Sequence, residues 1–166
     1  MSSAQEEHKS RTTQDPEEFG DTQLVRDLLE VCHFAYLRGY LSATEGNLSI
    51  RVAENLILST ASNTCKGRIS EADLLFSDLD GNSVGAAKQG KKLSTALKTH
   101  LRASRKRNDI KAIVHAHPTV AVGFTVAGKA LTASVLPEVV CTLGSIPTAP
   151  YATPSTDEIP ASIEEL

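Results

Sequence analysis

Two short β-prone runs joined by only three residues constrain the fold of this chain most strongly. Residues 47–52 and residues 56–60 have the composition of strands, and Ala53, Glu54 and Asn55 between them are typical of a hairpin turn. Strands joined by so short a connection lie side by side and run in opposite directions. The sequence therefore predicts a largely antiparallel sheet.

Helical patterns surround this hairpin. Apolar residues recur at helical spacing over residues 24–36, and Gly39 is a plausible stop. Further helices are predicted over residues 94–107, 119–127 and 137–143, with one helical turn at residues 70–73. Strands are predicted over residues 75–79, over the run that carries His115 and His117, and over residues 146–149. This mixture indicates one α/β domain over residues 21–166, preceded by a polar, disordered tail over residues 1–20.

The bulk composition excludes several classes of protein. The chain has 166 residues and a formal net charge of −3, and a nucleic-acid partner would require a basic face. No apolar run approaches the length of about 20 residues that a membrane helix needs. Residues 1–20 lack the apolar segment of a secretory signal. Three cysteines are too few for a disulfide framework, and Cys32 and Cys141 are expected to be buried thiols. A cytoplasmic location is expected, with neither nucleic acid nor a membrane as partner.

A pair of histidines separated by one residue is the clearest candidate site. An apolar run leads into His115 and His117, and Pro118 then ends the strand. Residues i and i+2 of a strand share a face, so both imidazoles can converge on one metal ion. Zinc would be held about 2.0–2.1 Å from each nitrogen. The alternative is that both histidines satisfy only local hydrogen bonds at the end of a strand.

Small polar residues gather at two further places. Residues 60–67 form a loop of small polar residues directly after a strand, and such loops offer hydroxyl and backbone N–H groups to an anion. Ser94 and Thr95 open a predicted helix, whose first N–H groups attract phosphate. An ordinary surface loop and simple helix capping by Ser94 explain the same residues. His100, on that helix, is expected to be structural or solvated.

The last residues begin an amphipathic helix. Thr156 can cap it, and Ile159, Ile163 and Leu166 line one face. The chain then stops with nothing after it to cover that face. An interrupted domain is therefore expected.

Taken together and in this order, several blocks resemble the class II aldolase/adducin family. The resemblance runs from about residue 24 to residue 166. Its blocks are Glu45-Gly-Asn-Leu-Ser-Ile-Arg51, Leu58-Ser-Thr-Ala-Ser-Asn63 with Lys66-Gly67, Asp78-Leu-Asp-Gly81, Lys92-Leu-Ser-Thr-Ala-Leu-Lys-Thr-His100, Asn108-Asp-Ile-Lys-Ala-Ile-Val-His-Ala-His-Pro118, Pro137-Glu-Val-Val140, Gly144-Ser-Ile-Pro147 and Pro150-Tyr151. The resemblance implies a three-layer α/β/α fold with a largely antiparallel central sheet flanked by helices, its final part missing from this chain.

The resemblance also implies a reaction and a site. It assigns His115 and His117 to two of the family's three zinc-binding histidines. It assigns the substrate phosphate to Asn47, Ser62, Asn63, Ser94 and Thr95. The implied activity is that of a zinc-dependent aldehyde-lyase, which cleaves or epimerises a phosphorylated sugar through a metal-stabilised enediolate. Members of the family are homo-oligomers, typically tetramers.

Two departures from the family pattern predict impaired activity. Ala96 stands where the family has the Glu or Asp that transfers a proton, and the third zinc histidine would lie beyond Leu166. Zinc would then be weakly held, because good sites have three or four protein ligands. The family also has Gly where Asn63 stands. The alternatives are a non-catalytic association domain, like the head domain of adducin, or a degenerate family member. No substitute base is evident, and His100 would be the first residue to mutate.

Overall fold

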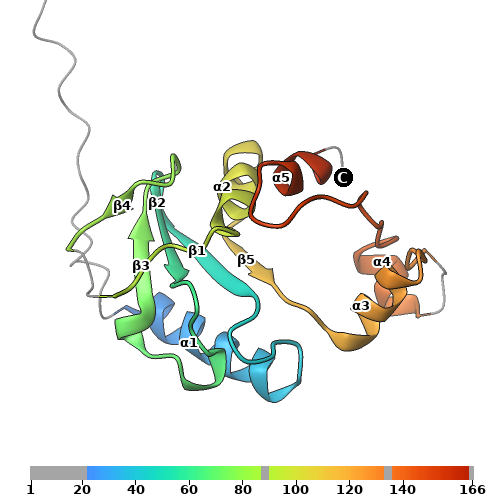
Figure 1. The fold of residues 1–166 in the computed structure, drawn as a ribbon, viewed down its shortest axis with the longest axis horizontal. Coiled ribbons are helices and arrows are strands. Elements are labelled where there is room, and N and C mark those ends of the chain that lie inside the picture. The colour runs from blue at the N-terminus through green and yellow to red at the C-terminus, as the bar shows by residue number, and fades with distance from the viewer. Residues whose placement is uncertain (1–21, 87–89, 133–135, 165–166) are drawn as a thin grey trace, which may run out of the picture.

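The computed structural model describes residues 22–86, 90–132 and 136–164. Its strands form a sheet in the order β4-β3-β2-β1-β5, with every neighbouring pair antiparallel (Figure 1). The strands are β1 (Asn47–Ala53), β2 (Leu56–Thr60), β3 (Leu74–Ser77), β4 (Ser83–Val84) and β5 (Ala112–His115). The predicted antiparallel sheet is confirmed. The tail predicted for residues 1–20 lies outside the described residues.

The hairpin of β1 and β2 is the centre of the sheet. Ser49 faces Ser59, Ile50 faces Leu58, and the register shifts by a bulge after Arg51. On its other side, β1 pairs with β5, and this register places His115 opposite Asn47. The pairing therefore brings the strand of the histidine pair beside the start of β1.

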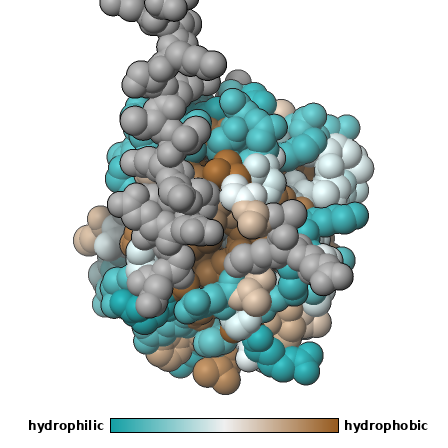
Figure 2. All heavy atoms as spheres, turned by 90° about the vertical axis from the view of Figure 1, so that its left-hand side faces the viewer, coloured by the Kyte–Doolittle hydropathy of each residue, from teal (hydrophilic) through white to brown (hydrophobic). Residues whose placement is uncertain are grey.

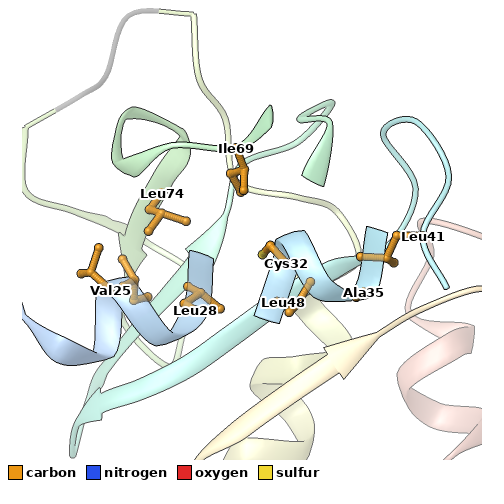
Figure 3. Close-up of a cluster of buried hydrophobic side chains, with 9 residues drawn as sticks. Val25, Leu28, Cys32, Ala35, Leu41, Leu48, Ile69 and Leu74 are labelled. Carbon is orange, nitrogen blue, oxygen red and sulfur yellow. The ribbon is translucent and has the colours of Figure 1, made fainter. Parts of the chain in front are cut away.

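Helix α1 (Gln23–Leu37) covers one face of the sheet and forms the larger core. Its apolar stripe meets Leu48 of β1 and Leu74 of β3, as Figure 3 shows. The buried residues of this cluster are Val25, Leu28, Cys32, Ala35, Leu41, Leu48, Leu58, Ile69 and Leu74. Each leucine-sized side chain buried here contributes about 1.5–3 kcal/mol. Cys32 is buried, as predicted.

Helix α2 (Leu97–Lys106) covers the opposite face of the sheet. Leu97 and Leu101 pack on Ile57 of β2, which points away from α1 because side chains alternate along a strand. The three-layer arrangement of helix, sheet and helix is thus present. The predicted start at residue 94 is wrong by three residues, because Ser94 belongs to a turn whose carbonyl accepts the N–H of Leu97 at 3.0 Å.

Short turns connect β2 to β3 and end β3. The 3₁₀ helices are η2 (Lys66–Arg68) and η3 (Glu71–Asp73), and the predicted helical turn at residues 70–73 is confirmed by a capping box between Ser70 and Asp73. Strand β3 ends at Ser77, two residues before its predicted end. The reason is that the Asp78 carboxylate accepts the N–H groups of Asp80 and Asn82 and closes a turn there.

Beyond β5 the chain runs away from the sheet through α3 (Thr119–Val126) and α4 (Pro137–Thr142) (Figure 1). Both helices lie where the sequence predicts them. The predicted strand over residues 146–149 is wrong, because Ile146 makes only an isolated bridge with Leu131. Burial of Cys141 is also wrong: its thiol is exposed, since α4 does not pack on the sheet.

Helix α5 (Glu158–Ser162) returns to the sheet and lies beside α2 (Figure 1). Pro160 is buried, Lys98 bonds to Asp157 at 2.9 Å, and Arg102 pairs with Glu164. Ile163 of its predicted apolar face is still 37 % exposed and lines a hollow with Ala103 of α2, so this part of the face is not covered by the described residues. Leu166, the last member of the predicted face, lies outside the described residues.

Figure 2 shows the side of the molecule that lies at the left of Figure 1. Hydrophilic residues frame it, and apolar atoms are visible in its middle. No helix in the described ranges is long and apolar enough to cross a membrane.

Candidate functional site

A pocket of about 220 Å³ opens where β1 begins and β5 ends. It brings together all of the predicted site residues except Thr95. The residues that line it are Thr44, Gly46, Asn47, Ala61, Ser62, Asn63, Lys66, Ser94, Ala96, His115 and His117. These residues come from segments far apart in the sequence. The pairing of β1 with β2 and β5 and the turn before α2 bring them together.

The imidazole of His115 is oriented by its neighbour across the sheet. Its Nδ1 lies 2.8 Å from Oδ1 of Asn47, and an amide oxygen can only accept, so Nδ1 donates. The Nε2 of a neutral His115 then carries a lone pair. Burial of the ring away from water lowers the pKa of His115, and the nearby His117 and Lys66 lower it further. His115 is thus biased toward the neutral form, which can ligate a metal.

The imidazole of His117 turns toward His115. The two Nε2 atoms are 3.1 Å apart, and Nδ1 of His117 lies 3.7 Å from Oε2 of Glu45. Its backbone N–H donates to the carbonyl of Tyr40 at 3.0 Å, which holds the chain after β5 against the turn before β1. The expectation that both imidazoles share one side of the strand end is confirmed in geometry.

The spacing of the two nitrogens fits a shared metal ion. Nitrogens held about 2.0–2.1 Å from a tetrahedral zinc are roughly 3.3 Å apart. Two lone pairs facing each other at 3.1 Å need a proton or a cation between them. Among the described residues, no group of three or more His, Cys, Asp or Glu surrounds this point. The pair therefore offers two ligand positions, with the Glu45 carboxylate 3.7 Å from Nδ1 of His117, beyond hydrogen-bond distance.

Asn63 shapes the loop that closes one side of the pocket. Its φ is +55°, in the left-handed region where Gly is at ease and Asn is better tolerated than other residues. Asn63 therefore adopts a backbone conformation that most other side chains would reach only with strain. The N–H of Ser62 donates to the carbonyl of Lys92 at 2.8 Å, which ties this loop to the segment before Ser94.

The start of α2 differs from the prediction. Ala96 is its N-cap and no side chain caps it, so capping of the helix by Ser94 is not found. In the turn before the helix, Oγ of Ser94 accepts the N–H of Ala96 at 3.3 Å and its carbonyl accepts that of Leu97, so those N–H groups are not all free for an anion. The hydroxyl of Thr95 lies 3.1 Å from that of Ser155, on the exposed side. Thr95 is therefore turned away from the pocket, while Ser94 and Ala96 line it.

His100 lies one turn further along α2, between the helix and the sheet. It is only 1 % exposed, and its Nδ1 lies 2.7 Å from Oγ of Ser49. Burial lowers the pKa of His100 to about 4, and the nearby His115 adds to the shift. His100 is a buried, neutral residue and does not line the pocket in the described structure. The structural role expected for it is confirmed.

Two residues of the site were missed by the sequence analysis. Lys66 is 1 % exposed and donates to the carbonyls of Thr44 at 3.0 Å and Thr64 at 2.9 Å. Gly46 has a φ of +66°, and a Cβ there would lie 2.5 Å from the carbonyl oxygen of His115. A Gly before the strand was the available signal for this close approach. No local signal distinguishes a buried Lys from the usual exposed one.

A larger hollow of about 780 Å³ lies on the other side of His115. Its lining is mainly apolar and includes Phe124, Leu131, Ile146 and Tyr151. The polar groups converge in the smaller pocket instead, so the chemistry is assigned there.

Comparison with known proteins finds relatives whose names refer to sugar phosphates. A methylthioribulose-1-phosphate dehydratase of Azotobacter vinelandii is 36% identical over 95 residues, which is 57% of this chain and 45% of the relative. An L-fuculose phosphate aldolase of Methanococcus maripaludis is 32% identical over 107 residues, 64% of this chain and 56% of the relative. The chain thus spans about half the length of these curated relatives.

A solved structure agrees with these relatives. The L-fuculose-1-phosphate aldolase of Thermus thermophilus superposes with a TM-score of 0.69 and 30% identity, over 86% of this chain and 69% of the other. The family model for the class II aldolase and adducin N-terminal domain matches residues 26–166. The chain therefore belongs to the class II aldolase and adducin family.

Proposed function

We propose that the pocket binds a phosphorylated sugar beside a divalent metal ion of the zinc type, as the substrate and metal site of an aldolase-like lyase. The observation that carries the proposal is the convergence of His115 and His117, with Nε2 atoms 3.1 Å apart, on a pocket whose other polar side chains are hydroxyls, amides and one lysine. The names of the two curated relatives, a methylthioribulose-1-phosphate dehydratase and a fuculose phosphate aldolase, support a phosphorylated sugar as ligand.

Each group in the pocket has a task in this proposal. The side chains of Asn47, Ser62, Asn63 and Ser94 hold the phosphate through hydroxyl and amide donors. His115 and His117 hold the metal, and Asn47 orients the ring of His115. When bound, the metal would act as a Lewis acid that polarises the carbonyl oxygen of the sugar. Thr95, which the resemblance assigned to the phosphate, is left out because its hydroxyl meets Ser155.

We propose further that metal binding and turnover are weak in this chain. Two imidazoles leave zinc short of the three or four protein ligands of good sites. Among the described residues that line the pocket, none is Asp or Glu, and Ala96 occupies the position of the family's proton-transferring acid. The loss of a positioned acid or base typically costs about 10²–10⁴-fold in rate.

Paired titrations test the proposal. Isothermal titration with zinc is made on the chain, on a His115→Asn/His117→Asn double variant and on a Ser62→Ala/Ser94→Ala double variant. Phosphate binding to the same proteins is followed by amide NMR shifts. We expect the histidine variant to lose zinc binding and keep phosphate binding. We expect the serine variant to lose phosphate binding and keep zinc binding. Zinc binding that survives loss of both histidines would overturn the metal assignment.

A second candidate function is an association domain without catalysis. The absence of an acidic side chain from the described pocket lining favours it, as does the exposed apolar surface of α3 and α4. Val120, Val126 and Leu143 are 74%, 84% and 63% exposed. We propose that this surface takes part in a homo-oligomer, as large apolar patches mark contact sites. Self-association in sedimentation equilibrium, with no cleavage of sugar phosphates by the oligomer, would favour this second function.

A further inference from the structure

Lys66 is a buried positive charge without a matching negative one. Its side chain is 1 % exposed, and its Nζ donates to the backbone carbonyls of Thr44 and Thr64. Among the described residues, no carboxylate forms an ion pair with it. Burial of an ammonium is costly unless it is paired, and two neutral carbonyls compensate the charge only in part. The third hydrogen of this ammonium has no acceptor among the hydrogen bonds of the described residues.

The position of Lys66 links this charge to the pocket. Thr44 precedes Gly46 and Asn47 on one rim of the pocket, and Thr64 follows Ser62 and Asn63 on the other. Lys66 thus bridges the two rims and lines the pocket between them. Its charge is close enough to lower the pKa of His115.

The side chain of Asn47 carries a second donor in the same pocket. Asn47 is 2 % exposed, and its Nδ2 has no hydrogen-bond partner among the described residues, while its Oδ1 is taken by His115. A buried N–H group without an acceptor is destabilising, so an acceptor brought by a ligand would be favourable. An ammonium with one hydrogen left over and an amide N–H without an acceptor, in one pocket whose described lining holds no carboxylate, are a donor set for an anion.

We propose that Lys66 is the residue that makes this pocket select phosphate-bearing ligands over neutral ones, with Asn47 as its uncharged partner donor. This inference rests on the proposed function of the pocket. The phosphate supplies the negative charge that Lys66 lacks, and the carbonyls of Thr44 and Thr64 fix the ammonium before the ligand arrives. No bond is made or broken in this step.

The test compares a neutral variant with a matched control. Lys66→Met removes the charge and keeps most of the length. Lys92→Met removes an exposed charge from the segment that bonds to Ser62. Binding of inorganic phosphate, ribose 5-phosphate, ribose and zinc is measured for each by titration. We expect Lys66→Met to weaken both phosphate ligands at least about tenfold, the loss of a charge-assisted hydrogen bond, with ribose affinity unchanged and zinc affinity not reduced.

The outcomes separate this inference from the proposed function. Suppose that Ser62→Ala/Ser94→Ala weakens phosphate binding, whereas Lys66→Met binds phosphate as tightly as the original chain. That result overturns the role of Lys66 and leaves the pocket assignment standing. Absence of phosphate binding from the original chain overturns both. If Lys66→Met does not fold, the ¹⁵Nζ resonance of Lys66 in the original chain is followed during phosphate titration. A saturable shift supports the inference, and an unmoved resonance overturns it.

Discussion

Nδ1 of His115 lies 2.8 Å from Oδ1 of Asn47, and these two residues are also the pair at the end of the ladder between β5 and β1. One register of one strand pair therefore decides two things together. It orients the imidazole whose Nε2 lies 3.1 Å from that of His117, and it holds the amide whose Nδ2 has no hydrogen-bond partner among the described residues. If β5 slipped by one residue against β1, the side chains of His115 and Asn47 would no longer lie on the same face of the sheet.

Asn47→Ala should weaken zinc binding by about 10–100-fold, because His115 loses the acceptor that holds its ring. The measurement is a zinc titration at neutral pH. Thr95→Ala is the control, since Thr95 lies outside the pocket, and it should leave zinc and phosphate binding unchanged. An Asn47→Ala variant with the original zinc affinity would show that the hydrogen bond does not position His115.

Ala96→Glu should raise the affinity for zinc, because Ala96 lines the pocket of His115 and His117 and a carboxylate is a zinc ligand. A negative charge is also favourable at the N-terminal end of α2. Ala96→Gln is the control of equal length without charge. Cleavage of sugar phosphates should be little or none in the original chain and should not be fully restored by Glu. Robust cleavage by the unmodified chain would contradict this account, and His100 would then be mutated first.

Substitutions at Asn63 test whether the loop after β2 needs a positive φ at this position. Asn63→Gly should change the free energy of unfolding by less than about 1 kcal/mol, because Gly adopts a positive φ freely. Asn63→Val should destabilise the chain by about 1–3 kcal/mol, because a β-branched residue is strained at that φ. Urea unfolding at neutral pH gives both values. Equal stability of the two variants would show that the loop does not need this conformation.

His100 should make stability fall in mild acid. Its pKa is about 4 in the folded chain, below the value of about 6.5 expected when unfolded. Above pH 6.5 both states are neutral and stability is complete. Between pH 6.5 and pH 4 the unfolded chain binds a proton that the folded chain does not. Stability therefore falls by about 1.4 kcal/mol per pH unit, to a loss of about 3 kcal/mol.

The control for His100 is His100→Asn, which retains a group for Ser49 but does not titrate. Urea unfolding at pH 7.5 and pH 5 should show a smaller loss of stability in this variant than in the original chain, whatever its absolute stability. The same pH dependence in both chains would mean that other groups cause the acid effect.

Local patterns in the sequence determined much of the architecture. The short connection made β1 and β2 antiparallel neighbours, although it is only Glu54 and Asn55, since Ala53, predicted to be in the turn, pairs with Leu56. The apolar spacing of residues 24–36 placed α1, because both features depend on contacts between near neighbours. The spacing of His115 and His117 predicted two imidazoles on one side, and their Nε2 atoms do meet. The predicted strand through His117 is wrong, however: β5 ends at His115, and the N–H of His117 instead bonds to the carbonyl of Tyr40. The order of the blocks matched the family, which the comparison confirmed.

Tertiary contacts decided the rest. The hydroxyl of Thr95 points outward to Ser155, which is 60 residues away in the sequence. Of the predicted strand at residues 146–149, only the isolated bridge between Ile146 and Leu131 forms. The burial of Lys66 depends on carbonyls of two separate loops, and that of His100 on a hydroxyl of β1. The sequence by itself determined which segments become strands and helices and which histidines share a face. Only the folded chain decided which polar groups are buried and left without a partner, because that depends on residues brought together from distant segments.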